Sequence, residues 1–293
     1  MNRLQKNIGY YIIAFLLPAL IGYVVFSLLP MFSAFYLSFT SWDIIGGTPE
    51  WIGIENYINI VKSDEFYRVL MNTLKFIAMY IPAIMISSFL VATLFDSKVK
   101  GVTGFRILLF IPVLTSWVAG AIIWRSVLNG QYGLLNNILA LIGIDGPGWL
   151  TDPNWSMVSI VMVSIWKDIG FFSLIIFGGL RGIDKSIYEA AEIDGASRFQ
   201  IMKSITLPLV SPTLFFVLIT TIINSFQLFP QVMVMTQGGP LGSTQVMVER
   251  IYVYGFRYFE MGYAAALSMI LLVIIVTVTV IQLLLQRKWV YYE

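Results

Sequence analysis

The sequence predicts an all-α integral membrane protein with six transmembrane helices and both termini in the cytoplasm. Of its 293 residues, 58% are hydrophobic and only 12% are charged, and the mean hydropathy is +0.82. Soluble domains are only about 45–50% apolar. The apolar residues form six long runs, and the basic residues gather on alternate connections between these runs. We expect residues 1–293 to form a single transmembrane domain.

Six segments reach the roughly 20 apolar residues that a helix needs to cross a hydrocarbon core about 30 Å thick. They are residues 11–38, 70–95, 107–127, 156–180, 208–233 and 261–285. Each must satisfy its backbone hydrogen bonds within lipid, and none alternates with period two, so helices are expected. The first run exceeds the roughly 7–15-residue core of a signal peptide, so we interpret it as a retained anchor.

The basic residues predict which side each connection faces, because cytoplasmic connections are enriched in Lys and Arg. If the N-terminus is cytoplasmic, the basic residues inside are Arg3, Lys6, Lys98, Lys100, Arg106, Arg181, Lys185, Arg198, Lys203, Arg287 and Lys288. Those outside are then Lys62, Arg68, Arg250 and Arg257. The remainder fall within spans or at their ends. Both termini are therefore predicted to be cytoplasmic.

The composition excludes several classes of function. The chain has no Cys and no His, which removes disulfides, thiol chemistry, haem ligation by His and nearly all zinc sites. The net charge is only +2 and the basic residues form no stripe, so no nucleic-acid partner is expected. No Gly-x-x-x-x-Gly-Lys-Ser/Thr phosphate loop exists in the sequence, so any ATP hydrolysis must occur on another chain.

The cytoplasmic segment 181–204, between the fourth and fifth spans, is predicted to form a helix, a bend and a second helix. Asp184 or Ser186 can cap the first helix, and Gly195 ends it. Ser197 can cap the second helix. The segment is too short to be a soluble domain, so work in water requires other subunits.

Two interpretations of this segment follow from its residues. Ala190 and Ala191 leave room for close approach by another surface, and Glu189 offers a carboxylate to an Arg or Lys of a soluble partner. Alternatively, the segment is an interfacial amphipathic loop with its apolar side among the lipid headgroups.

A specific motif favours the docking surface. Glu189-Ala-Ala-x-x-Asp194-Gly-Ala196, followed by Ile205-Thr-Leu-Pro208, closely resembles the signature of binding-protein-dependent ABC importer permeases. The similarity covers nearly the whole chain and is to carbohydrate permeases of the maltose-type larger-subunit family. The supporting segments are Trp51-Ile-Gly-Ile-Glu-Asn-Tyr57, Asn72-Thr-Leu-Lys-Phe76, Thr236-Gln-Gly-Gly-Pro240 with Thr244, and Gly262-Tyr-Ala-Ala-Ala266. Asp184 departs from the family, which usually has Pro there.

The resemblance implies a type I ABC importer permease fold in the cell (cytoplasmic or inner) membrane. It implies that the 181–204 loop docks in a cleft of an ATPase subunit, through a coupling surface that includes Glu189, Ala190, Ala191, Asp194, Gly195, Leu207 and Pro208. It further implies a second homologous permease subunit, two ATPase subunits and an extracytoplasmic substrate-binding protein. No cofactor is expected in this chain, since ATP and Mg would bind the partner ATPase.

Polar residues inside the spans are candidates for the substrate pathway, because charge at the centre of a membrane helix costs roughly 2.5–3.5 kcal/mol on insertion scales. Lys167 and Asp168 lie near the middle of the fourth span, about 100° apart on the helix, so at least one should face a polar cavity or a partner subunit. A structural ion pair with a partner is the alternative. In the fifth span, Asn224 and Gln227 share a face that could bind sugar hydroxyls or neighbouring helices.

The resemblance favours the pathway, because maltose-type permeases contact sugar from these two stretches. The candidates are Lys167, Asp168, Phe171, Thr221, Asn224, Ser225 and Gln227. Charges at the first two positions depart from the maltose pattern, so a different sugar is expected.

The sequence thus predicts the transmembrane subunit of an ATP-driven sugar importer that works by alternating access and is not itself an enzyme. The alternatives are a permease for another polar solute such as a glycerol phosphate, and an ion-coupled secondary transporter. Secondary transporters usually contain inverted repeats. In this chain the sequence of spans one to three is not repeated in spans four to six. A membrane-embedded enzyme is poorly supported without His, Cys or a carboxylate pair within one span.

Overall fold

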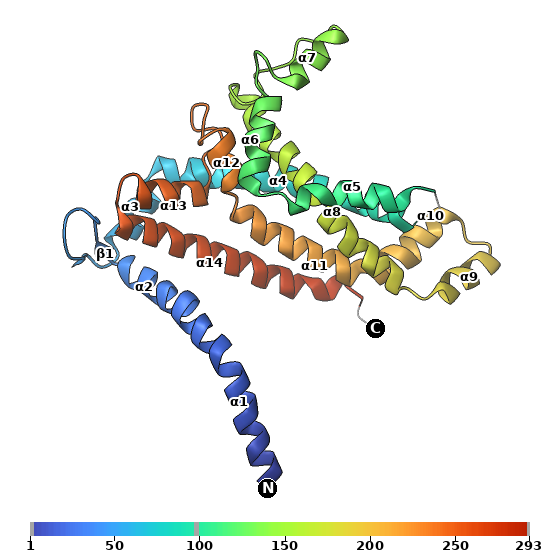
Figure 1. Cartoon of the computed structure of the whole chain (residues 1–293), viewed down its shortest axis with the longest axis horizontal. Coiled ribbons are helices and arrows are strands. Elements are labelled where there is room, and N and C mark those ends of the chain that lie inside the picture. The colour runs from blue at the N-terminus through green and yellow to red at the C-terminus, as the bar shows by residue number, and fades with distance from the viewer. Residues whose placement is uncertain (1–2, 97–99, 292–293) are drawn as a thin grey trace. The chain divides into compact units, whose positions relative to one another are not determined.

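The structure, a computed structural model, describes residues 3–96 and 100–291 and is almost entirely helical (Figure 1). Lys98, counted above among the cytoplasmic basic residues, lies outside the described residues. The described residues divide into two compact units. The first comprises residues up to Ser63 together with Ile251–Leu272, and the second comprises Asp64–Arg250 and the residues from Val273 onward. A single transmembrane domain stays a prediction.

The first unit begins with a nearly continuous helical stretch made of α1 (Arg3–Tyr23), the π-helical turn η1 (Val24–Leu28) and α2 (Leu29–Leu37). A short antiparallel hairpin follows, made of β1 (Thr40–Ser41) and β2 (Glu50–Trp51), in which Thr40 pairs with Trp51 and Ser41 pairs with Glu50. Helix α3 (Glu55–Lys62) completes this part of the chain.

Two segments that carried the family resemblance meet at this hairpin. The buried amide of Asn56 donates hydrogen bonds to the carbonyls of Ser38 (3.0 Å) and Thr40 (2.9 Å). Gly262, near the start of α14 (Met261–Leu285), approaches Thr40 so closely that a Cβ would collide with its carbonyl oxygen. The resemblance therefore includes residues that hold this hairpin in place.

The second unit contains most of the remaining helices. They are α4 (Asp64–Asp96), α5 (Val102–Leu114), α6 (Trp117–Val127), α7 (Leu134–Leu141), α8 (Pro153–Gly182), α9 (Lys185–Ile193), α10 (Arg198–Ile201), the π-helical turn η2 (Met202–Thr206), α11 (Leu207–Phe226) and α12 (Pro230–Met235). Helix α13 (Met247–Phe256) runs from the second unit into the first. Helix α14 runs from the first into the second, where the turn η3 (Gln286–Lys288) follows it.

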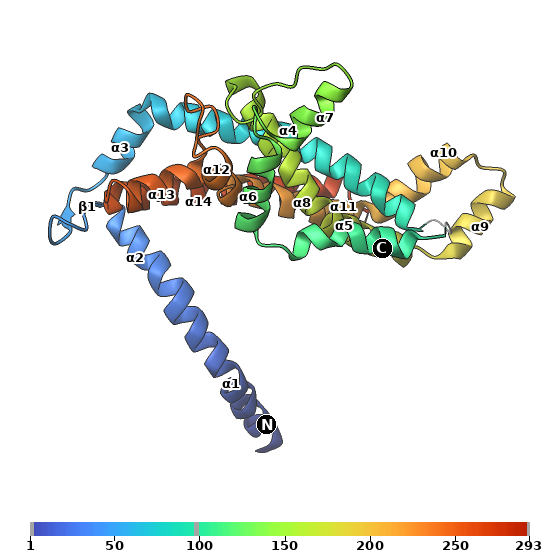
Figure 2. The same cartoon turned by 45° about the horizontal axis from the view of Figure 1, so that its top comes forward.

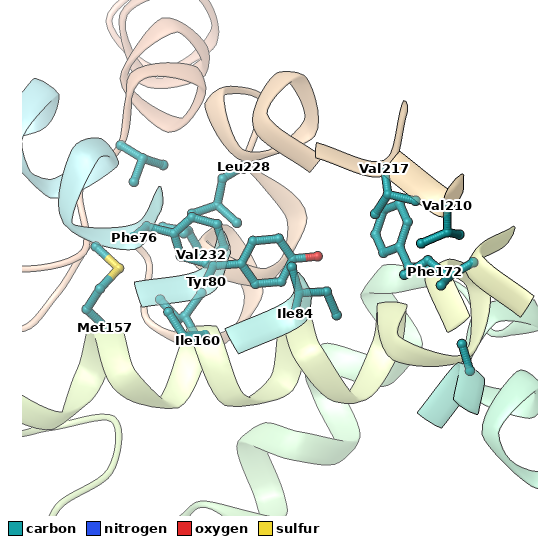
Figure 3. Close-up of a cluster of buried hydrophobic side chains, with 14 of the residues drawn as sticks. Phe76, Tyr80, Ile84, Met157, Ile160, Phe172, Val210, Val217, Leu228 and Val232 are labelled. Atoms are coloured by element: carbon teal, nitrogen blue, oxygen red, sulfur yellow. The ribbon is translucent and has the colours of Figure 1, made fainter. Parts of the chain in front are cut away.

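The core of the second unit lies between α4, α8 and α11, which pack side by side (Figures 1 and 2). Buried apolar side chains from these helices and from α12 form one cluster (Figure 3). Its labelled members are Phe76, Tyr80, Ile84, Met157, Ile160, Phe172, Val210, Val217, Leu228 and Val232. Burial of these side chains fixes the three helices that surround the candidate site.

Helix α8 is well defined at its start and closely packed along its length. Its N-cap Asp152 accepts a hydrogen bond from the backbone N–H of Asn154 at 2.9 Å, and Pro153 occupies the first turn, where its missing N–H costs nothing. At Gly170 the backbone of α5 comes so near that a Cβ would collide with the carbonyl of Leu109. Glycine is therefore required there for α5 and α8 to pack.

Within the described residues, five helices are long and apolar enough to cross a membrane, or six spans if the α5–α6 pair counts as one. The third expected span, 107–127, is not one straight helix, because the helix axis bends by 102° between α5 and α6. The fifth, 208–233, is likewise interrupted between α11 and α12. The orientation of the termini stays a prediction.

Candidate functional site

A polar cavity of about 310 Å³ lies in the second unit beside the ends of interrupted helices. Its walls come from α4, α6, α8, the end of α11, the start of α12 and the connection between these two helices. The lining residues are Phe76, Tyr80, Trp117, Ser164, Asp168, Asn224, Ser225, Gln227, Leu228, Pro230 and Gln231. A small concave site with aromatic walls and a few convergent polar groups is typical of ligand-binding pockets.

Both helix interruptions border this cavity. Thr115 and Ser116, which separate α5 from α6, have extended backbone with ψ values of 150° and 141°. Helix α11 ends at Phe226, and Pro230 begins α12 three residues after Gln227. Non-helical backbone at membrane depth is tolerated only where protein buries it or where it faces a polar cavity. The cavity therefore explains why both helices can be interrupted at this place.

Asp168 is the carboxylate of the cavity, and a tyrosine from another helix holds it. The Tyr80 hydroxyl of α4 donates a hydrogen bond to Asp168 Oδ2 at 2.7 Å. Ser164 precedes Asp168 by four residues on α8, so both side chains share the face that lines the cavity.

Lys167 points away from this face and towards the break between α5 and α6. Its buried Nζ donates to the carbonyls of Pro112 (2.5 Å), Val113 (3.0 Å) and Thr115 (2.7 Å). These carbonyls lie at the C-terminal end of α5, where helical acceptors have no intrahelical partner and the dipole favours a cation. The ammonium also lies 5.6 Å from the ring centre of Trp117, which lines the cavity. Lys167 therefore stabilises the helix break.

The structure brings together four of the seven residues predicted for the pathway. Asp168, Asn224, Ser225 and Gln227 line the cavity. The three others do not. Thr221 is buried and donates to the carbonyl of Val217 at 2.8 Å, and Phe171 is 43% exposed beside Phe172. Lys167 lies at the helix break, as described above.

Part of the lining was not predicted from the sequence. Tyr80, Trp117, Ser164 and Gln231 were not singled out, although Ser164 and Gln231 each had a weak signal. Ser164 lies four residues before Asp168, a spacing that places both on one helical face, and Gln231 lies four residues after Gln227 in what the sequence predicted as one span. Tyr80 and Trp117 required knowledge of which helices meet, and hydropathy alone does not supply it.

The 181–204 segment forms the predicted helix, bend and helix. Helix α9 ends in a Schellman motif, in which Gly195 N–H donates to Glu192 O (3.1 Å) and Ala196 N–H donates to Ala191 O (3.0 Å). Gly195 has a φ of +76°, a left-handed conformation that favours glycine. Figure 2 shows α9 and α10 beyond the ends of α8 and α11.

Both predicted N-caps are confirmed. The Asp184 carboxylate accepts the backbone N–H of Ser186 at 2.9 Å, and this hydrogen bond holds the pKa of Asp184 below its usual range. Ser197 forms a capping box with Gln200 at the start of α10. The local sequence therefore fixes both short helices.

The residues predicted for the coupling surface differ in exposure. Glu189, Ala190, Asp194, Gly195 and Leu207 are exposed, Pro208 is half-buried and Ala191 is buried. Two apolar side chains that were not predicted stand beside them, since Ile193 is 87% exposed and Phe199 is 74% exposed. The segment thus presents small, acidic and apolar side chains together.

A second polar cluster joins segments far apart in the sequence. The Asn72 amide donates to the carbonyls of Gly242 (2.8 Å) and Gln245 (3.1 Å), which ties α4 to the Gly-Gly-Pro loop. Arg250 pairs with Glu249 at 2.6 Å and Glu65 at 3.1 Å. Burial opposes the charge of Arg250, but the hydrogen bonds and charges of its two partners outweigh it and raise its pKa. These contacts fix the loop that precedes α13.

The sequence and fold match those of known transport proteins. The chain is 33% identical to the probable ABC transporter permease YesP of Bacillus subtilis, over 99% of this chain and 94% of that protein. It is 31% identical to the trehalose/maltose transport system permease MalF of Thermococcus litoralis, over 97% and 95% of the two chains. A chain in the crystal structure of a bacterial ABC transporter that imports the acidic polysaccharide alginate superposes with a TM-score of 0.86 at 25% identity, covering 98% of this chain and 99% of that one.

The family assignment rests on most of the chain. Residues 58–291 match the family model described as the inner membrane component of binding-protein-dependent transport systems. This range includes the cavity, both helix breaks and the α9–α10 segment. The chain therefore belongs to the family of binding-protein-dependent transport system inner membrane components.

Proposed function

We propose that this chain is the transmembrane subunit of an ATP-driven importer that moves a sugar or oligosaccharide across the cell membrane by alternating access. In this proposal both termini and the α9–α10 segment face the cytoplasm. A second homologous permease, two ATPase subunits and an extracytoplasmic binding protein complete the transporter.

The observation that carries the proposal is the exposed surface of the α9–α10 segment. Ile193 and Phe199 project from a short connection that also carries exposed charged side chains, and a partner surface would remove both from water. The neighbouring Ala190 leaves room for close approach, and Glu189 offers a charged acceptor. The Schellman turn at Gly195 holds these side chains in a fixed arrangement. This surface suits docking into a cleft of an ATPase subunit.

A carbohydrate substrate is supported by the cavity and by the relatives. The cavity combines amides and hydroxyls with the aromatic side chains of Phe76, Tyr80 and Trp117, which suits hydroxyl groups on an apolar ring face. The names of the relatives described above specify trehalose/maltose and alginate.

Energy coupling requires that the ATPase hold the α9–α10 segment differently in two states, because a ligand shifts an equilibrium only through unequal affinity. ATP binding would favour an outward-open arrangement, and release of the hydrolysis products would restore the inward one. ATP and Mg would bind the partner chains.

Two substitutions in the assembled transporter test this coupling. Glu189→Lys reverses a surface charge, and Gly195→Trp places a bulky residue at a positive φ. We expect both to abolish ATP-dependent uptake and to weaken co-purification of the ATPase subunits. Gly182→Ala is the matched control, because a Cβ there meets nothing within 4 Å.

Wild-type assembly and uptake in both variants would contradict the docking surface. Uptake that follows a proton or sodium gradient and ignores ATP would instead favour the secondary transporter.

A further inference from the structure

We propose that the cavity selects sugars without acidic groups, and that Asp168 is the residue that rejects anionic ones. This inference rests on the proposed function and names the class of sugar that the cavity takes. It would set this chain apart from its structural relative, which imports the acidic polysaccharide alginate. It also disfavours a glycerol phosphate.

Three hydroxyls of the cavity act as acceptors because their protons are already used, and the remaining donors, the amides and the Trp117 indole, carry no charge. Tyr80 donates to Asp168 Oδ2 at 2.7 Å, Ser164 donates to Ile160 O at 2.8 Å, and Ser225 donates to Thr221 O at 2.6 Å. These three hydroxyls and the Asp168 carboxylate can therefore only accept hydrogen bonds from a ligand. Carboxylates and phosphates themselves only accept hydrogen bonds, whereas sugar hydroxyls and ammonium groups can donate.

Lys167, the cation nearest in the sequence, attracts the Asp168 charge but forms no ion pair with it. Lys167 directs its ammonium at three backbone carbonyls of the helix break, and it does not line the cavity. The lining residues include no Lys or Arg. The cavity wall supplied by this chain is therefore negative, and a sugar acid would meet like charge where little water screens it.

Protection of a single cysteine tests this selectivity without the binding protein. The chain contains no Cys, so Asn224→Cys in a complex with Cys-free partner chains places one reactive thiol at the cavity wall. The probes are maltotriose, a glucosamine trimer and a galacturonate trimer, each titrated against maleimide labelling. We expect the two non-acidic trimers to protect at concentrations at least about tenfold below the acidic one.

Second substitutions identify Asp168 as the cause. Asp168→Asn keeps an oxygen for the Tyr80 hydrogen bond but removes the charge, so the ratio between acidic and neutral protection should fall to about one. Asp145→Asn, at an exposed carboxylate outside the cavity, should leave the ratio unchanged.

Equal protection by acidic and neutral trimers in the Asn224→Cys protein would overturn the proposal, as would a ratio that survives Asp168→Asn. Failure of every trimer to protect would count against both the inference and the sugar cavity. Loss of ATP-dependent uptake with a normal protection ratio would count only against the proposed transport function.

Discussion

Lys167 shows how a single residue can determine the shape of a membrane helix. An isolated lysine at the centre of a membrane helix costs roughly 2.5–3.5 kcal/mol on insertion scales, and buried carbonyls left unpaired at a helix end would cost more. The structure places the two together, since Nζ reaches the carbonyls of Pro112, Val113 and Thr115. The sharp turn between α5 and α6 and the buried ammonium thus stabilise each other.

Replacement of this lysine should destabilise the protein. Lys167→Met removes the ammonium from the carbonyls of Val113 and Thr115, while Pro112 O keeps the N–H and hydroxyl of Thr115, and we expect a loss on the order of 3 kcal/mol. Thermal unfolding of the purified complex in detergent measures the change. Lys75→Met is the matched control, because Lys75 is exposed on α4 and should shift the midpoint little. Equal shifts in the two variants would contradict this account of Lys167.

The sequence predicted that Lys167 and Asp168 would not neutralise each other fully, and in the structure the two charges attract each other but form no ion pair. Asp168 faces the cavity and Lys167 does not, as the rotation between adjacent helical residues requires. The partner of Lys167 was beyond sequence reasoning. A lysine can bind backbone carbonyls only where a helix ends, and hydropathy treated residues 107–127 as uninterrupted.

Among the elements, the short helices α9 and α10 were predicted most completely. Their limits depend on local chemistry, namely the caps Asp184 and Ser197 and the positive φ of Gly195. The break after α11 depends instead on tertiary context. Helix α11 ends at Phe226 although a mostly apolar stretch continues to Met235, so composition alone extends the span too far.

The Asp184 cap predicts a dependence of α9 on pH. Its pKa is lower in the folded protein than its ordinary value of about 3.9, so the ionised carboxylate stabilises the folded form. This stabilisation is present above the ordinary pKa and is lost as the pH falls through the folded pKa.

Hydrogen exchange of the α9 amides, compared between wild type and Asp184→Asn at each pH, measures this effect. We expect the extra protection of the wild type to be present at about pH 5 and to decrease towards about pH 3. A constant difference across this range would contradict the role of the carboxylate.

For the whole molecule, the natural absence of cysteine allows a direct test of orientation. Ser186→Cys lies on α9 and Leu241→Cys lies at a loop position that is 92% exposed. We expect a membrane-impermeant maleimide to label Leu241→Cys in intact cells, and Ser186→Cys only in inverted vesicles. The unmodified chain provides the unlabelled control. Labelling of Ser186→Cys from outside would reverse the topology derived from the basic residues.

The length and stiffness of α8 have a mechanical consequence. From Asp168 at the cavity to Gly182, just before α9, the chain is one uninterrupted helix without proline, about 20 Å long at 1.5 Å per residue. Helix α11, the other connection, starts from a π-helical turn. A straight helix without a break transmits displacement along its axis with little loss. A push on α9 would therefore move the Asp168 carboxylate and, through the close backbone contact at Gly170, carry α5 along with it.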